Sequence, residues 1–284
     1  MAIFSNQATL SYNGGSTNSN IAYGEILDVL AVTKTAVRDT YTPDELVTYV
    51  VTLRNTGVIA LSGLTVTDDL GGYTFGTGTV YPLTYEPGTA AVFADGVPQG
   101  APAVTAGPPM VITGINVAPG GDTVIVYQAR ANAFANPAAG GTVTNTVTVT
   151  GNGLNGPVTA TQTVTAAAGP DLTITKSITP AQVVENERVT YTFVIRNSGN
   201  EPVLATDNAV ITDTFDPVLT DLAVTFEGVA WTQGVQYNYN GTTGLFETVP
   251  GQLLVPAAAY TQDPATGTYT AAPGIATLVV TGTI

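Results

Sequence analysis

The chain contains two lysines, Lys34 and Lys176, and each stands in a stretch where apolar and small polar residues alternate. A period of two is typical of a β-strand with one buried face. It places Lys176 on one face with Ile174 and Ile178, and Lys34 on one face with Val32. Burial favours the neutral amine of a lysine, which is a nucleophile. Both lysines are therefore predicted to point into protein cores as reactive amines.

The same alternation turns an aspartate and an asparagine inward in the first half of the chain. Asp68 shares its face with Val66, and Asn145 shares its face with Val143 and Val147. A neutral amine can displace ammonia from a carboxamide, assisted by a protonated carboxyl group that polarises the carbonyl. The product is an isopeptide bond. The predicted intramolecular set is Lys34, Asn145 and Asp68.

A second set repeats these residue types but takes its asparagine from the N-terminus. Asp213 shares its face with Ile211, and Asn6 lies in SNQATLSYNG, which matches TNTVTVTGNG at residues 144–153. The hypothesis is that Lys176 bonds Asn6 of a neighbouring subunit, with Asp213 as proton shuttle. The alternative for both sets is a buried Lys–Asp ion pair beside a hydrogen-bonded asparagine, without any reaction.

Two copies of one pattern carry these residues. The first reads ELVTYVVTLRNTG and then LTVTDDL; the second reads ERVTYTFVIRNSG and then AVITDTF. Short Val- and Thr-rich strands separated by Gly, Pro and Asn turns indicate a β-sandwich. The predicted fold is all-β, with two tandem immunoglobulin-like domains at residues 28–168 and 169–284. Residues 1–27 are predicted to be an N-terminal donor strand or hairpin with its linker.

The two copies differ at their closing strand. Aligning Pro119-Gly120 with Pro273-Gly274 leaves nothing in the second copy that matches residues 142–150. The N-terminal segment resembles that strand, and residues 17–26 are expected to form the second strand of a hairpin with it. We therefore predict that a neighbour's N-terminus completes the second domain by strand addition. The alternatives are a disordered tail or pairing within one subunit. The expected inward face of the donor strand is formed by Phe4, Asn6, Ala8, Leu10 and Tyr12.

These motifs resemble the bacterial surface-repeat family called domain of unknown function eleven. The shared pattern is a Lys strand, a VTY strand that runs into an N-(S/T)-G turn, a TD motif, and a closing strand with NT. The resemblance covers residues 28–155 and 169–284. It implies an immunoglobulin-like sandwich on bacterial surface proteins and no catalytic activity on a substrate. The Lys, Asn and Asp sets also resemble the self-forming crosslinks of B-type collagen-adhesin domains.

Composition excludes several classes of function. Seven Lys and Arg against 21 Asp and Glu give a net charge of −14, which argues against nucleic acid and anionic membranes. The chain has no Cys and no His, so we expect no disulfide, no thiolate metal site and no enzyme. No apolar run is long enough to span a membrane, and the N-terminus has no recognisable signal peptide. No cofactor is expected, and calcium at a surface acidic cluster is left open.

The sequence therefore predicts a non-enzymatic subunit of a head-to-tail homopolymer, an extracellular pilus or appendage on a cell or spore surface. A head-to-tail contact between different surfaces generates open filaments when its rotation does not close. The alternative is a tandem immunoglobulin-like adhesin that displays loops such as residues 86–109 or 228–252 to a ligand.

Overall fold

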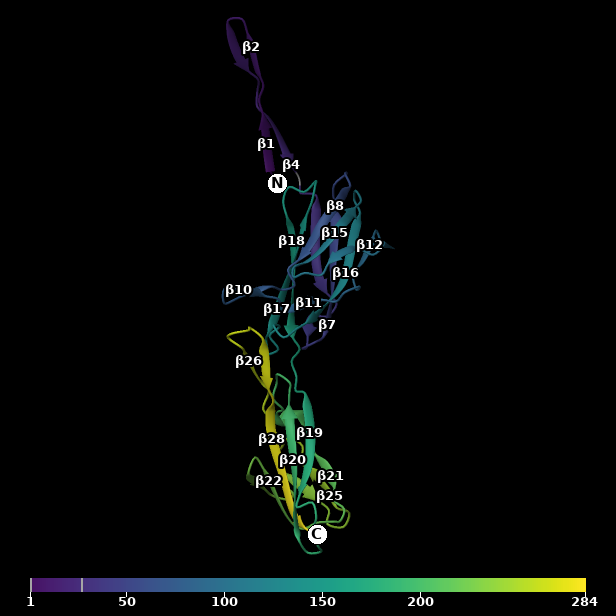
Figure 1. Cartoon of the computed structure of the whole chain (residues 1–284), viewed down its shortest axis with the longest axis vertical. Helices are drawn as coiled ribbons and strands as arrows, with labels where there is room; N and C mark the ends of the chain where they lie inside the picture. Colours follow the sequence, from purple (N-terminus) through teal and green to yellow (C-terminus); the bar gives the residue numbers. More distant parts are fainter. Residues whose placement is uncertain (1, 27) are drawn as a thin grey trace. The chain divides into compact units, whose positions relative to one another are not determined.

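The computed structural model describes residues 2–26 and 28–284, and its regular structure there is β-strand apart from one 3-10 helix, η1 (Ala205–Asp207). The all-β prediction is confirmed (Figure 1). The chain divides into two compact units. Unit 1 comprises residues up to 136 together with 142–165, and unit 2 comprises residues 137–141 and 166–284. Among the described residues, no helix has the length and apolar character needed to span a bilayer.

The N-terminal segment is a two-part β-hairpin around an Asn13-Gly14 turn, in which Gly14 has a φ of +116°. Asn6 faces Ala22 and Thr9 faces Asn18, so two residues of the first strand oppose three of the returning strand. Such an offset is a β-bulge. The N-terminal strand pairs with residues 15–18 and 22–26 of the same chain, close to the expected 17–26, and donation of this hairpin to a neighbour stays a prediction. The strand pairs are β1 (Ala2–Asn6) with β4 (Ala22–Ile26), and β2 (Thr9–Tyr12) with β3 (Gly15–Asn18).

Unit 1 is a sandwich of two antiparallel sheets whose Val- and Thr-rich strands bury alternate residues. The first sheet has the order β13 (Val97–Pro98), β12 (Ala91–Ala94), β16 (Asp122–Ala131), β7 (Leu46–Asn55) and β5 (Leu30–Ala36), and β11 (Leu83–Tyr85) also pairs with β16. The second has the order β14 (Ala103–Thr105), β15 (Met110–Val117), β8 (Leu61–Asp68), β17 (Thr142–Thr150), β18 (Val158–Ala166) and β6 (Thr40–Tyr41). A separate hairpin joins β9 (Tyr73–Phe75) and β10 (Gly78–Val80).

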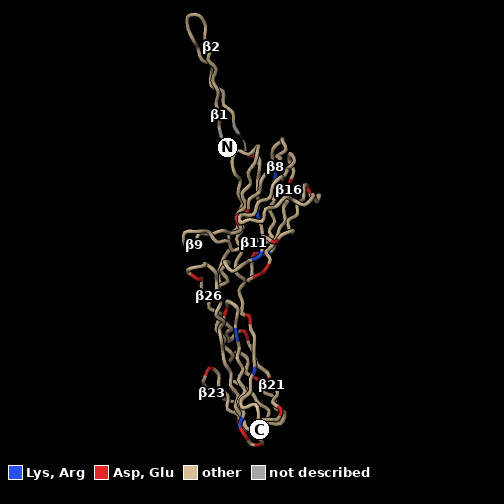
Figure 2. The backbone as a smooth tube through the Cα atoms, viewed as in Figure 1, with Lys and Arg blue, Asp and Glu red and all other residues tan. Residues whose placement is uncertain are grey.

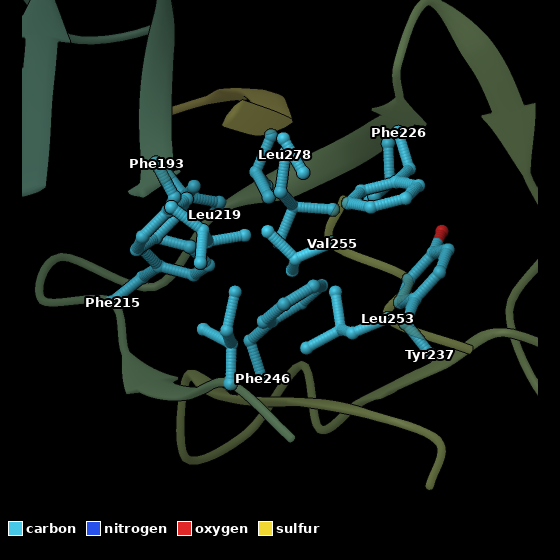
Figure 3. Packing of buried hydrophobic residues seen from close by; sticks show 14 of the residues in the cluster. Phe193, Phe215, Leu219, Phe226, Tyr237, Phe246, Leu253, Val255 and Leu278 are labelled. Carbon is cyan, nitrogen blue, oxygen red and sulfur yellow. The ribbon is translucent and has the colours of Figure 1, made fainter. Parts of the chain in front are cut away.

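Unit 2 repeats this plan with a shorter second sheet. Its first sheet has the order β19 (Leu172–Thr179), β20 (Arg188–Asn197), β28 (Gly274–Thr283), β22 (Thr220–Phe226) and β23 (Val229–Trp231). Its second has the order β21 (Thr212–Thr214), β25 (Leu245–Thr248) and β24 (Tyr237–Tyr239), and β26 (Ala259–Gln262) pairs with β27 (Tyr269–Ala272). The core between the sheets is aromatic and aliphatic, and it includes Phe193, Phe215 and Phe246 (Figure 3).

Strand pairing sets the correspondence between the two units. Asp122 faces Arg54 in unit 1, and Ile275 faces Arg196 in unit 2. This register makes Ile284 the counterpart of Ala131, and each donates its amide to a glutamate carbonyl, Ile284 to Glu187 and Ala131 to Glu45. The alignment through Pro119-Gly120 and Pro273-Gly274 is therefore wrong by one residue. The turn before β28 is one residue shorter than the turn before β16, so matching the turns misplaces the strands.

Candidate functional site: a buried lysine cluster and its open counterpart

Lys34 and Asp68 form a buried ion pair between the two sheets of unit 1. Lys34 lies on β5 and Asp68 at the end of β8, with 2.6 Å between Nζ and Oδ2 and no exposed side-chain surface on either residue. Burial lowers the pKa of Lys34 from its ordinary value, and the charge and hydrogen bond of Asp68 oppose that shift. The lowered pKa increases the share of neutral amine, the form that acts as a nucleophile.

Two tyrosines enclose this pair. The rings of Tyr49 on β7 and Tyr127 on β16 stack with 5.6 Å between centroids, and Lys34 Nζ lies 4.9 Å from the Tyr49 centroid. The Tyr127 hydroxyl donates a hydrogen bond to Asp68 Oδ2, and the Leu70 amide donates one of 2.9 Å to Oδ1. Burial raises the pKa of both tyrosines, so both hydroxyls stay protonated donors at neutral pH.

Asn145 brings a carboxamide to the same core. It lies on β17 with no exposed surface, two residues from Val147, which faces Asp68 across the β8–β17 ladder. Within the described part of the chain, neither its amide nitrogen nor its carbonyl oxygen has a hydrogen-bond partner. It still acts on Tyr49 and Tyr127, whose pKa values it lowers against the stronger effect of burial. Leaving a buried polar group unpaired costs about 1–3 kcal/mol of folding free energy, and native structures rarely keep such a group without a functional reason.

Unit 2 contains the counterpart of the lysine pair, but there it is open to solvent. Lys176 on β19 contacts Asp213 on β21, and their side chains are 39% and 19% exposed. Lys176 Nζ lies 4.6 Å from the centroid of Tyr191, the counterpart of Tyr49, and 5.2 Å from that of Phe215. The inward direction predicted for Lys176 agrees with these ring contacts. Its predicted burial is wrong for this chain alone, because no described strand covers this face.

The open face comes from a free strand edge. In unit 1, β8 pairs with β15 on one side and β17 on the other, whereas β21 has β25 as its single partner among the described strands. All eight residues of β19 are exposed, including Leu172, Ile174 and Ile178. In β5, by contrast, Leu30 and Lys34 are buried. Unit 2 thus has an apolar face and unpaired backbone groups where unit 1 has β17.

The N-terminal hairpin exposes the complementary features. Phe4, Leu10 and Tyr12 are 57%, 66% and 64% exposed, and Asn6 is exposed on β1. From Ala2 to Gly24 the segment carries no charged residue, as the absence of blue and red there shows (Figure 2). Soluble proteins commonly protect exposed strand edges with charges or Pro, so a neutral apolar edge indicates a binding surface. Ala8 is also exposed, in the two-residue break between β1 and β2.

Two tyrosines of the cluster are not among the site residues predicted above. Alternation along β7 and β16 places Tyr49 and Tyr127 on the buried faces, and this signal could have indicated them. Asp69 accepts a hydrogen bond of 2.8 Å from the Thr146 amide and so holds β17 in place, while its counterpart in unit 2 is Thr214. No group of three or more acidic, His or Cys side chains suited to a metal ion occurs among the described residues.

Comparisons with known proteins give weak similarities. No family model and no curated protein matches the chain, so the surface-repeat resemblance stays a prediction. The major pilin subunit BcpA of Bacillus cereus is 12% identical, with a TM-score of 0.37 over 96% of this chain and 73% of that one. The major pilin SpaD of Corynebacterium diphtheriae is 14% identical, with a TM-score of 0.38 over 85% and 58%. The collagen-binding subdomain of the Enterococcus faecalis surface protein ACE is 9% identical, with a TM-score of 0.31 over 46% and 94%.

Proposed function

We propose that this protein is a structural subunit of a bacterial surface fibre, in which the N-terminal hairpin of one copy adds to the free edge of β21 in the next. The observation that carries the proposal is the open edge of unit 2, with the exposed face of β19 beside it. Strand addition satisfies the backbone groups of such an edge and covers the apolar face. Because the donor and acceptor surfaces differ, each copy can both give and receive a hairpin, which generates a filament.

The residues of the hairpin fit the place that β17 fills in unit 1. Matching Asn6 to Asn145 puts Ala8 at the position of Val147 and Leu10 at that of Val149, both of which are fully buried. In unit 1, Val147 faces Asp68, so the same register sets Ala8 against Asp213. In this register Asn6 has the same position relative to Lys176 that Asn145 has relative to Lys34 in unit 1. The neutral hairpin enters this position without burying a charge of its own.

The joint is proposed to become covalent. The neutral amine of Lys176 attacks Cγ of the neighbour's Asn6, the carbon–nitrogen bond of the carboxamide breaks, and ammonia leaves. Asp213 takes the proton from the attacking nitrogen and returns it to the leaving nitrogen, so that no oxidant or further reactant is required. Lys34, Asn145 and Asp68 perform the same reaction within unit 1. The Asn145 amide, which has no hydrogen-bond partner among the described residues, is then one of the reactants.

Energetics favours a covalent joint. Burial of Phe4, Leu10 and Tyr12 stabilises the contact by about 1.5–3 kcal/mol for each side chain. Association costs about 4–15 kcal/mol before any ordering of the hairpin. The non-covalent contact is thus moderate in strength, and an isopeptide bond removes it from equilibrium. This suits a fibre on a cell or spore surface that is exposed to shear and protease.

Assembly and crosslinking are tested separately. Deleting residues 1–26 should abolish filaments in negative-stain microscopy while both units stay folded by circular dichroism. If the truncated chain forms filaments of the same width, strand donation is wrong.

Wild-type filaments boiled in detergent should run as a ladder of multimers, and Lys176→Ala and Asn6→Ala should each reduce the ladder to monomer. Asn20→Ala, in the bulge of the same hairpin, is the matched control and should keep the ladder. A wild-type ladder that collapses to monomer on boiling would leave the joint non-covalent.

A further inference from the structure

The hydroxyl group of Tyr49 has no hydrogen-bond partner among the described residues, although it is fully buried. Its neighbour in the stack, Tyr127, uses its own hydroxyl to donate to Asp68. Tyr49 therefore holds a spare donor in the core of the lysine cluster. A buried hydroxyl without an acceptor costs free energy, and natural cores rarely keep one without a reason.

A second polar group without a partner lies in the same core. The carboxamide of Asn145 is buried, and neither of its polar atoms has a hydrogen-bond partner among the described residues. No hydrogen bond of normal geometry joins the two groups in the unreacted chain. The amine of Lys34 lies 4.9 Å from the centroid of the Tyr49 ring, so the nucleophile and the hydroxyl share one small region of the core that Asn145 also enters.

We propose that the Tyr49 hydroxyl stabilises the oxyanion that forms when Lys34 attacks Asn145. This inference rests on the proposed crosslink. Attack on Cγ converts the carbonyl of Asn145 into a tetrahedral centre whose Oδ1 carries negative charge. A donor already in place for that charge, in a site closed to solvent, is worth far more than one in solvent. When the intermediate collapses, ammonia leaves, the carbonyl re-forms and the hydroxyl keeps its proton.

The second unit supports the choice of Tyr49 over Tyr127. Strand pairing sets Tyr191 against Val280 where unit 1 sets Tyr49 against Tyr127. The site in unit 2 thus keeps the first tyrosine and replaces the second by valine. Lys176 Nζ lies 4.6 Å from the Tyr191 centroid, close to the 4.9 Å between Lys34 and Tyr49. Tyr191 is therefore assigned the same role toward Asn6 of a neighbouring copy.

The test is Tyr49→Phe in the full chain, which keeps the ring and its stacking and removes one oxygen atom. Chains made by cell-free translation are quenched in guanidinium at intervals, and intact mass reports the fraction that has lost one ammonia. Loss of one oxyanion donor should slow that reaction about 100-fold or more. Tyr85→Phe is the matched control, because Tyr85 is a buried tyrosine whose hydroxyl accepts from Ala90 outside the cluster, and it should react at the wild-type rate.

A structural role is tested in a background that cannot react. In a Lys34→Ala chain, Tyr49→Phe should leave the urea midpoint unchanged or raise it, because it removes a buried hydroxyl that has no hydrogen-bond partner among the described residues. If the wild type loses ammonia and Tyr49→Phe loses it at the same rate, Tyr49 is not the oxyanion donor although the crosslink stands. If Tyr49→Phe lowers the midpoint in the unreactive background, its role is structural and the inference is wrong. A wild-type mass that equals the plain sequence would overturn the crosslink and this inference together.

Discussion

Units 1 and 2 contain the same lysine–aspartate pair in two environments. In unit 1 the pair is sealed, because β17 and β18 extend the second sheet across it. In unit 2 the second sheet ends at β21, and Lys176 remains 39% exposed. Strand alternation gives both lysines the same inward direction. The difference indicates that one covering hairpin closes the pair to solvent, and burial there lowers the pKa of Lys34 from its ordinary value.

The largest expected effect comes from supplying the covering hairpin within one chain. Moving residues 2–26 to a flexible linker after Ile284 should close unit 2 on itself and abolish filaments. Burial of Phe4, Leu10 and Tyr12 should stabilise unit 2 by about 5 kcal/mol, which guanidinium unfolding would measure. The same fusion carrying Leu10→Asp should lose that gain, because the aspartate would enter the core unpaired. Unchanged stability in the fusion would mean that the hairpin does not fit the free edge.

The next effect contrasts the two lysines directly. In chains that lack residues 1–26 and carry Asn145→Ala, neither pair can crosslink. Lys34→Ala should then destabilise unit 1 by about 3–5 kcal/mol, because it leaves Asp68 buried without its cation. Lys176→Ala should cost at most about 1 kcal/mol, because its pair is screened by solvent. Equal losses in urea unfolding would contradict the contrast between sealed and open sites.

A smaller effect is expected from a comparison of Leu10 in the hairpin with Val149, its counterpart in unit 1, in subunit stability and in filament assembly. Leu10→Ala should leave the subunit's own stability within about 0.5 kcal/mol, because Leu10 is exposed in the hairpin. It should weaken filament assembly by about 2 kcal/mol, or roughly 30-fold, measured by sedimentation in a Lys176→Ala background without crosslinks. Val149→Ala should do the reverse, with a loss of about 2 kcal/mol in unit 1 and unchanged assembly. Similar behaviour of the two variants would argue against the shared register.

The smallest effect is a dependence of stability on pH in an unreacted unit 1. In Asn145→Ala, burial holds the pKa of Lys34 below its unfolded value of 10.5, so the folded state binds fewer protons between those two values. Stability should therefore rise with pH in that window, by less than about 1.4 kcal/mol per pH unit. Above the ordinary tyrosine pKa of about 10 the trend should reverse, because burial raises the pKa of Tyr49 and Tyr127 in the folded state. Adding Lys34→Met should remove the rise, and a rise that persists would have another origin.

Much of the site could be predicted from the period of the strands. Alternation alone turned Lys34, Asp68 and Asn145 inward, and the structure buries all three. The comparison of the two copies predicts an incomplete sheet in unit 2, and β21 has β25 as its single partner among the described strands. Side-chain direction depends on the local alternation of residues, and the difference between the units is visible when the two repeats are aligned, so both can be predicted from the sequence. The isopeptide bonds and the exchange of hairpins between copies stay predictions.

Other features depend on contacts between distant strands, and only the tertiary structure decided them. Tyr127 donates a hydrogen bond to Asp68 across the sandwich from β16, and within the described part of the chain the buried amide of Asn145 has no hydrogen-bond partner. Lys176 points inward and is still exposed, because burial depends on what covers a face and not on the residues of the face itself. The alternation of residues in a strand sets the direction of each side chain through backbone geometry. Whether that direction leads into a core or into solvent is set by the neighbouring strands of the sandwich.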